Sequence, residues 1–192
     1  DLTPTAVKGA GLLEGKPPES ASGVQTLVIG GLGKGGKGYF ALDISAPAST
    51  TADSVLWEFP NVASQDDIND IGFSFSKPLV IRTNSVGEAE SWIVIFGNGY
   101  DSANGNAVLY MLNPMTGDII KKIVADNPYV DSGNGLSSPI AVDVNADEKV
   151  DFVYAGDLKG NMWKFDLTGP NANQWGVAYN DGTHDQPLFK AE

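Results

Sequence analysis

The same series of short apolar segments recurs in the same order along the chain, and this recurrence constrains the fold more than any single motif. Each unit has a Ser/Thr-Pro-apolar segment, then an apolar run that ends at or next to glycine, then a run with a polar end. The segments lie at 3–7, 28–31 and 39–43, at 76–80, 95–98 and 109–113, and at 138–142, 154–157 and 162–166. A fixed order of short segments is typical of a protein built from structural repeats.

The composition of these segments predicts strands. They are rich in β-branched and aromatic residues and are separated by Gly, Asn, Asp and Pro, and no stretch shows a sustained 3.6-residue apolar period. A further strand-like run follows in two units, VLWEF at 55–59 and DIIKKIV at 118–124. Four antiparallel strands per repeat are typical of the blades of a β-propeller.

We therefore predict an all-β fold of four-stranded antiparallel blades. The approximate blades are 1–73, 74–134 and 135–192, all within one propeller domain over 1–192. About three blades cannot close a ring, because the smallest common propellers have about four. The chain is thus predicted to be an arc of a larger propeller, and a meandering β-sandwich is the alternative.

The charge of the chain argues against one large class of partners. The chain has 192 residues, with 12 Lys and Arg against 24 Asp and Glu and a formal net charge of −12. A nucleic-acid surface needs a basic patch, so we expect no nucleic-acid partner. No apolar run approaches the ~18 residues of a membrane span, so we expect no direct membrane insertion. The absence of cysteine excludes disulfides, zinc-thiolate sites and cysteine nucleophiles.

An acidic stretch in the third unit has the side-chain spacing of a calcium-binding loop. In VDVNADEKVDF, Asp143, Asn145, Asp147 and Asp151 occupy positions 1, 3, 5 and 9 of an EF-hand-like loop, and Lys149 offers its backbone carbonyl at position 7. Oxygen ligands at alternate positions suit a loop that curls around a hard cation. The spacing predicts a Ca²⁺ site formed by these residues, and a solvated acidic hairpin is the alternative.

The stretch departs from an EF-hand in two ways. Glu148 stands where a glycine normally makes the sharp turn, and Tyr154 stands where a bidentate glutamate normally closes the site. The chain then runs from Asp151 directly into FVYAG, with no helical pattern on either side. We expect a loop that joins two strands within one blade, with a non-glycine residue at its turn.

Two other polar stretches resemble ligand sites, but turns explain them more simply. GGLGKGGKG at 30–38 has the glycine spacing of a dinucleotide fingerprint, yet that motif must open a helix and this one joins two predicted strands. FGNGYDSANGNAVLY at 96–110 places Asp101 and Asn106 around an Asn-Gly pair. These could form a weak second cation site, although Asn-Gly is a common turn sequence.

The remaining polar and aromatic residues suggest no active site. We expect the stretch SQDDIND, with Asp66, Asp67 and Asp70, to be a solvated loop that connects blades. The tryptophans of predicted strands, Trp57, Trp92 and Trp163, are expected to pack between blades. His184 is the single histidine and lies in a polar, glycine-containing segment, so a Ser-His-Asp site would depend on a serine brought there by the fold.

Three longer segments carry a family resemblance: GGLGKGGKGYFALDIS, FGNGYDSANGNAVLYMLNPMTG and SSPIAVDVNADEKVDFVYAGDLKGNMWKFDLTG. Together they closely resemble the C-terminal β-propeller of the PilC/PilY family of type IV pilus-associated proteins, over nearly the whole chain. The resemblance implies a quinoprotein-type propeller with calcium in a D-x-[DN]-x-D-x-x-x-D loop. Here the implied ligands are again Asp143, Asn145, Asp147, the Lys149 carbonyl and Asp151, with Asn145 in place of the common aspartate.

The resemblance also implies a function that composition does not reveal. It implies a non-enzymatic pilus biogenesis factor at the pilus tip, the outer membrane or the bacterial cell surface. Its implied roles are adhesion, the priming of pilus assembly and calcium-dependent control of pilus extension and retraction. Its implied partners are type IV pilus components, such as minor pilins at the pilus tip, and a host-cell surface.

Two alternatives remain open from the sequence. ALDIS, LWEF and MLNPMTGDII also resemble repeats of quinone-dependent dehydrogenases, in which calcium would anchor the quinone PQQ, although the cysteine pair of many such enzymes is absent. The other alternative is a purely structural interaction propeller with an inert acidic loop.

Overall fold

The N-terminal part of the chain forms the first of several antiparallel sheets in the computed structural model, which describes residues 5–7, 26–125 and 133–191. Its four strands are neighbours in chain order. They are β1 (Thr5–Val7), β2 (Leu27–Gly31), β3 (Tyr39–Asp43) and β4 (Val55–Phe59). Each strand pairs with the one before it, which is the meander expected for a propeller blade.

The same meander is repeated in two further sheets. The second contains β5 (Leu79–Arg82), β6 (Trp92–Gly97), β7 (Val108–Leu112) and β8 (Ile119–Val124). The third contains β9 (Ile140–Val142), β10 (Phe152–Gly156), β11 (Asn161–Asp166) and β12 (Gly176–Val177), and β13 (Phe189–Lys190) also pairs with β11. The predicted four-stranded antiparallel units are confirmed in the first two sheets. The third has the same four-stranded meander plus a fifth strand, β13, and the sequence revealed neither β12 nor β13.

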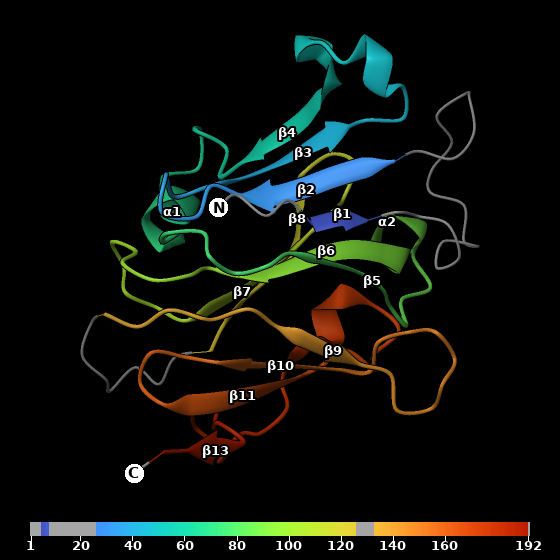
Figure 1. Cartoon of the computed structure of the whole chain (residues 1–192). Helices are drawn as coiled ribbons and strands as arrows, with labels where there is room; N and C mark the ends of the chain where they lie inside the picture. Colours follow the sequence, from blue (N-terminus) through green and yellow to red (C-terminus); the bar gives the residue numbers. More distant parts are fainter. Residues whose placement is uncertain (1–4, 8–25, 126–132, 192) are drawn as a thin grey trace.

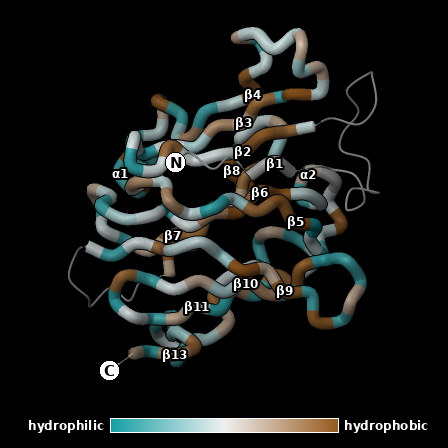
Figure 2. The backbone as a smooth tube through the Cα atoms, viewed as in Figure 1, coloured by the Kyte–Doolittle hydropathy of each residue, from teal (hydrophilic) through white to brown (hydrophobic). Residues whose placement is uncertain are grey.

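The second sheet is sandwiched between the other two (Figure 1). Because side chains alternate across a strand, β6 and β7 supply one core on each face. Ile93, Ile95, Leu109 and Met111 lie in the core shared with the third sheet. Val94, Phe96, Val108, Tyr110 and Leu112 lie in the core shared with the first sheet. This explains why every residue of β7 is buried, and Figure 2 shows hydrophobic residues concentrated in these central strands.

Two of the three strand tryptophans pack between sheets as predicted. Trp57 lies in the core between the first and second sheets, and its Nε1 donates a hydrogen bond of 2.9 Å to the Pro114 carbonyl. Trp163 is 1% exposed in the core between the second and third sheets. The prediction is wrong for Trp92, which is half-buried and lies outside both described cores. Trp175 is buried in the same core as Trp163, where its indole N–H donates a hydrogen bond to the Gly169 carbonyl.

The glycine that ends the second strand of a sheet allows the chain to pass closely to the next sheet. A Cβ atom on Gly97 would lie 2.3 Å from the Ser137 carbonyl oxygen, and one on Gly31 would lie 2.4 Å from that of Ser74. Real Cβ atoms do not approach this closely, so these positions require glycine. The glycine endings of the first two units therefore mark contacts between consecutive sheets, whereas a Cβ on Gly156 in the third unit would make only ordinary contacts, at 3.7 Å or more.

Helices are short and lie in the connections. They are α1 (Gln65–Asp70), α2 (Glu88–Ser91) and the 3₁₀ turns η1 (Pro47–Ser49), η2 (Ala52–Ser54) and η3 (Ala172–Gln174). Across the described residues, no helix combines the length and apolar character needed to span a bilayer.

Candidate functional site

The acidic loop at 143–151 connects β9 to β10 and projects beyond the ends of these two strands. It is the orange loop next to β9 in Figure 1. The two strands close at its base, where the Asp151 N–H donates a 3.0 Å hydrogen bond to the Val142 carbonyl. The prediction of a loop between two strands of one sheet is confirmed.

Asp143 organises the first half of the loop. Its Oδ1 accepts hydrogen bonds from the N–H groups of Asn145 (3.1 Å) and Ala146 (2.7 Å), and its Oδ2 accepts one from Glu148 (2.8 Å). Burial tends to raise the pKa of the Asp143 carboxyl, but these backbone donors outweigh it and hold the pKa below its usual value. Asp143 is therefore ionised at neutral pH.

Two further predicted ligands repeat the same local pattern. The Asn145 Oδ1 accepts from the Asp147 N–H at 2.9 Å, and the Asp147 Oδ1 accepts from the Lys149 N–H at 3.0 Å. Both side chains are exposed, whereas Lys149 is half-buried. The side-chain oxygens at alternate positions thus shape the loop, because each accepts a hydrogen bond from the backbone N–H two residues ahead.

The backbone takes two sharp turns in the loop. Glu148 has φ of 67° and Ala146 has φ of 61°, both in the left-handed region that glycine favours. The expectation that Glu148 occupies a sharp turn is confirmed. The turn at Ala146 had no signal in the sequence, because alanine rarely adopts this conformation.

Asp151 differs from the other predicted ligands because it is buried, with only 4% of its surface exposed. Its Oδ2 accepts from the Val144 N–H at 2.9 Å, and its Oδ1 accepts from the side-chain amide of Asn84 at 3.3 Å. Asn84 lies between β5 and α2 of the second sheet. Asp151 is thus the point at which the loop is fixed to the body of the protein.

The donor chemistry of the loop fits calcium. All its candidate ligands are oxygens, and Asp143, Asp147 and Glu148 supply three carboxylates within one short loop. In the described part of the chain, no three His, Cys, Asp or Glu side chains are grouped closely enough to hold a metal ion. An ion would therefore have to draw these carboxylates together and replace some of their N–H partners.

A second acidic group lies on α1, and here the prediction of a solvated loop is wrong. Asp67 and Asp70 are 8% and 3% exposed, and Lys122 of β8 makes ion pairs with both, at 3.1 Å and 2.6 Å. A third pair of 2.9 Å joins Lys122 to the exposed Asp66. The stretch forms a helix because Ser64 caps its N-terminus by accepting the Asp67 N–H.

The α1 cluster is satisfied within the protein. Burial disfavours the charged form of Lys122, but hydrogen bonds to Asp70 and Asp66 outweigh it and raise the lysine pKa. Burial likewise opposes ionisation of Asp67, yet donors on Ser64 and Lys122 hold its pKa below the usual value. The carboxylates thus have a built-in cation, which favours a structural role.

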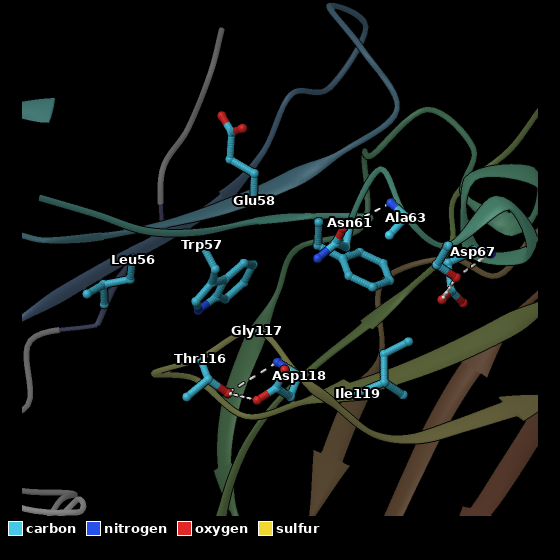
Figure 3. Close-up of a pocket in the computed structure, with 12 residues that line it drawn as sticks. Leu56, Trp57, Glu58, Asn61, Ala63, Asp67, Thr116, Gly117, Asp118 and Ile119 are labelled. Carbon is cyan, nitrogen blue, oxygen red and sulfur yellow. Dashed lines mark hydrogen bonds between the residues drawn. The ribbon is translucent and has the colours of Figure 1, made fainter. Parts of the chain in front are cut away.

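A cavity of about 580 Å³ lies beside this cluster, between β4 and the turn that leads into β8 (Figure 3). Trp57 and Phe59 line it with Gly117, and Asp67 and Asp118 are its nearest carboxylates besides Glu58. A Cβ on Gly117 would lie 2.7 Å from the Trp57 ring, so the turn covers that ring closely. The Asp118 carboxylate accepts from the Thr116 hydroxyl, and the Asp67 carboxylate is already paired, so this lining offers no clear ligand site.

The other polar stretches form turns. The glycine-rich stretch at 30–38 runs from the end of β2 to the start of β3 without a helix, as predicted. Gly105 has φ of 64°, as expected for an Asn-Gly turn, and the amides of Asn104 and Asn106 bind the Asp70 carboxylate. Asp101 pairs with Lys37 at 3.2 Å. His184 donates its backbone N–H to Asp181 in a small turn.

Comparison with known proteins gives a consistent result. Residues 6–187 match the family model described as the PilY1 beta-propeller domain. The chain is 40% identical over 176 residues to a type IV pilus biogenesis factor PilY1 homolog from Xylella fastidiosa, covering 87% of this chain. It is 43% identical over 148 residues to the type IV pilus biogenesis factor PilY1 of Pseudomonas aeruginosa (strain UCBPP-PA14), covering 77% of this chain.

A solved structure has the same fold. The crystal structure of the Pseudomonas aeruginosa PilY1 C-terminal domain aligns with a TM-score of 0.73 and 36% identity, covering 88% of this chain and 35% of that one. The chain spans 11% and 12% of the lengths of the two curated relatives. Together with the three sheets described above, this coverage confirms that the chain folds as part of a larger propeller.

Proposed function

Because the chain belongs to the PilY1 β-propeller domain family, we propose that it is a non-enzymatic module of a type IV pilus biogenesis factor. Support comes from the curated relatives, whose names describe pilus biogenesis factors rather than enzymes. The same names give no support to the quinone-dependent dehydrogenase alternative.

We further propose that the loop at 143–151 binds Ca²⁺. The proposed ligands are the side chains of Asp143, Asn145, Asp147 and Asp151 and the carbonyl of Lys149. The observation that carries this proposal is the local fold of the loop. The side-chain oxygens of Asp143, Asn145 and Asp147 each accept a hydrogen bond from the backbone N–H two residues ahead, which already arranges them along one turn. Bound calcium would supply a compact positive charge that offsets the repulsion among the carboxylates.

The position of the ligands suggests what binding does to the chain. Asp143 directly follows β9 and Asp151 directly precedes β10, so an ion shared by both would link the ends of two paired strands. Because Asp151 is buried and Asp143 is not, the ion would also join the exposed loop to the protein core. Calcium is therefore expected to reduce the mobility of the loop and to present it as one fixed surface.

We propose that the propeller acts at the bacterial surface, at the pilus tip or the outer membrane, with minor pilins and other pilus components as its partners. A host-cell surface is a further proposed partner. We also propose that calcium occupancy of the loop shifts the balance between pilus extension and pilus retraction. The names of the relatives, which are type IV pilus biogenesis factors, support an association with the pilus machinery.

Calorimetric titration with CaCl₂ tests the calcium site. We expect a dissociation constant on the order of 10⁻⁴ to 10⁻³ M, as in other extracellular calcium loops. Asp147→Ala should abolish binding, because it removes a central ligand that is exposed and whose loss leaves the core intact.

Asp53→Ala is the matched control, because Asp53 is also an exposed aspartate but lies in η2, between β3 and β4 of the first sheet. This variant should bind calcium like the wild-type chain. Equal binding by the Asp147→Ala variant, or no binding by the wild type, would exclude this loop as the calcium site.

A further inference from the structure

The side chain that holds Asp151 comes from a different sheet. Asn84 lies 67 residues before Asp151 in the sequence, and its amide donates to the Asp151 Oδ1 at 3.3 Å. The same amide nitrogen donates to the Val150 carbonyl at 3.1 Å, and the Val150 N–H donates to the Arg82 carbonyl at 2.8 Å. Three hydrogen bonds thus join the end of the acidic loop to the last residue of β5 and to the connection that follows it.

The segment that carries Asn84 is itself held firmly. Thr83 is 1% exposed, its N–H binds the Ser91 carbonyl, and its hydroxyl binds the Glu90 carbonyl at 2.6 Å. The Glu90 carboxylate accepts from the Ser85 hydroxyl at 2.7 Å and from the Ala172 N–H of the third sheet at 2.9 Å. The amide of Asn84 is therefore presented from a fixed turn.

A neutral amide suits this position. It donates to one oxygen of Asp151 while the Val144 N–H holds the other, so the carboxylate plane is fixed without any loss of its negative charge. A lysine here would supply a competing positive charge, as Lys122 does for the α1 cluster. Groups that hydrogen-bond to a metal ligand orient it, and their removal typically weakens metal binding about 10–100-fold.

We propose that Asn84 is a positioning residue for the calcium loop, so that the ion is coupled to the contact between the second and third sheets. This inference rests on the calcium site proposed above. Calcium binding to the third sheet then stabilises the β5–α2 connection of the second sheet. By linkage, an intact connection strengthens calcium binding to the same extent.

Calcium titration of an Asn84→Ala variant tests this coupling. We expect a dissociation constant about 10–100-fold weaker than in the wild-type chain. Asn104→Ala is the matched control, because Asn104 also donates its side-chain amide to a carboxylate, but to that of Asp70 in α1 and not to one of the calcium loop. Its calcium affinity should match the wild type. An affinity of Asn84→Ala within twofold of wild type overturns the inference.

A double-mutant cycle separates positioning from a general structural role. In an Asp151→Asn background, Asn84→Ala should cause little further loss of calcium affinity, because the carboxylate that Asn84 positions is already gone. A merely structural contribution would weaken binding equally in both backgrounds, and that additive result would overturn the inference.

Hydrogen exchange of the wild-type chain provides a test without substitution. Calcium should slow exchange in the 143–151 loop and also in peptides covering 82–91. Protection limited to the loop would overturn the coupling while leaving the calcium site intact. A wild-type chain that binds no calcium would instead overturn the calcium site itself, so the two failures are distinguishable.

Discussion

Two acidic stretches of this chain have similar composition but different partners in the folded protein. In α1, Asp66, Asp67 and Asp70 surround the Lys122 ammonium, and two of the three carboxylates are buried. In the loop at 143–151, the carboxylates accept hydrogen bonds from amide N–H groups. The first group contains its own cation, whereas the second keeps most of its charge at the surface, available to a cation from solution.

The comparison shows why acidic clusters cannot be classified from composition alone. A carboxylate that meets a lysine in the fold contributes to stability, and its pKa falls for that reason. A carboxylate that accepts hydrogen bonds only from neutral amides is also ionised, but no cation in the protein compensates its charge, so it remains a candidate ligand. The difference is set by β8, which brings Lys122 next to an acidic helix 55 residues earlier in the sequence.

The largest expected effect is the removal of this internal cation. Lys122→Met keeps an apolar side chain of similar length but leaves Asp67 and Asp70 buried without their partner. Removal of one partner of a buried ion pair typically lowers the free energy of unfolding by about 3–5 kcal/mol. Urea unfolding should therefore show a loss of stability of that order.

Lys121→Met is the control for this change. Lys121 is adjacent on β8, where side chains alternate between faces, and it pairs with Met111 of β7 rather than with Tyr110. It should change stability by less than about 1 kcal/mol, as expected for a side chain outside a buried network. Equal losses in the two variants would show that the α1 cluster is not held by Lys122.

Lowering the pH should also reveal the contribution of Lys122, through a smaller change in the free energy of unfolding. The pKa of Asp67 is lowered in the folded protein, so its contribution to stability is present above the unfolded value of about 3.9 and is lost as the pH falls through the folded value. Unfolding free energies measured from pH 6 to pH 2 should decrease below about pH 4. The decrease should be shallower in Lys122→Met, because the lysine that helps lower this pKa is absent. Parallel curves would contradict a role for Lys122 in the titration.

Local features were predictable from the sequence, and distant pairings were not. The strands follow from alternation and from glycine and proline boundaries, and the turn at Glu148 follows from the spacing of the loop. The partners of Asp67 and Asp151 could not be predicted, because Lys122 and Asn84 approach them only when separate sheets pack together. Neither partner has a local signal, since a single lysine or asparagine in a strand or turn is usually a surface residue.

The smallest expected effect concerns the left-handed backbone conformations of the loop at 143–151, which no residue of α1 adopts. Glu148 and Ala146 both adopt left-handed conformations, which cost a non-glycine residue about 1–2 kcal/mol. Glycine avoids this cost but loses more entropy on folding, by about 0.5–1 kcal/mol. Glu148→Gly and Ala146→Gly should therefore each raise the unfolding free energy by about 0.5–1 kcal/mol. Glu148→Gln, which removes the charge but keeps the side chain, should leave it unchanged. Stabilisation by Glu148→Gln as large as that by Glu148→Gly would assign the effect to charge repulsion in the loop instead of backbone strain.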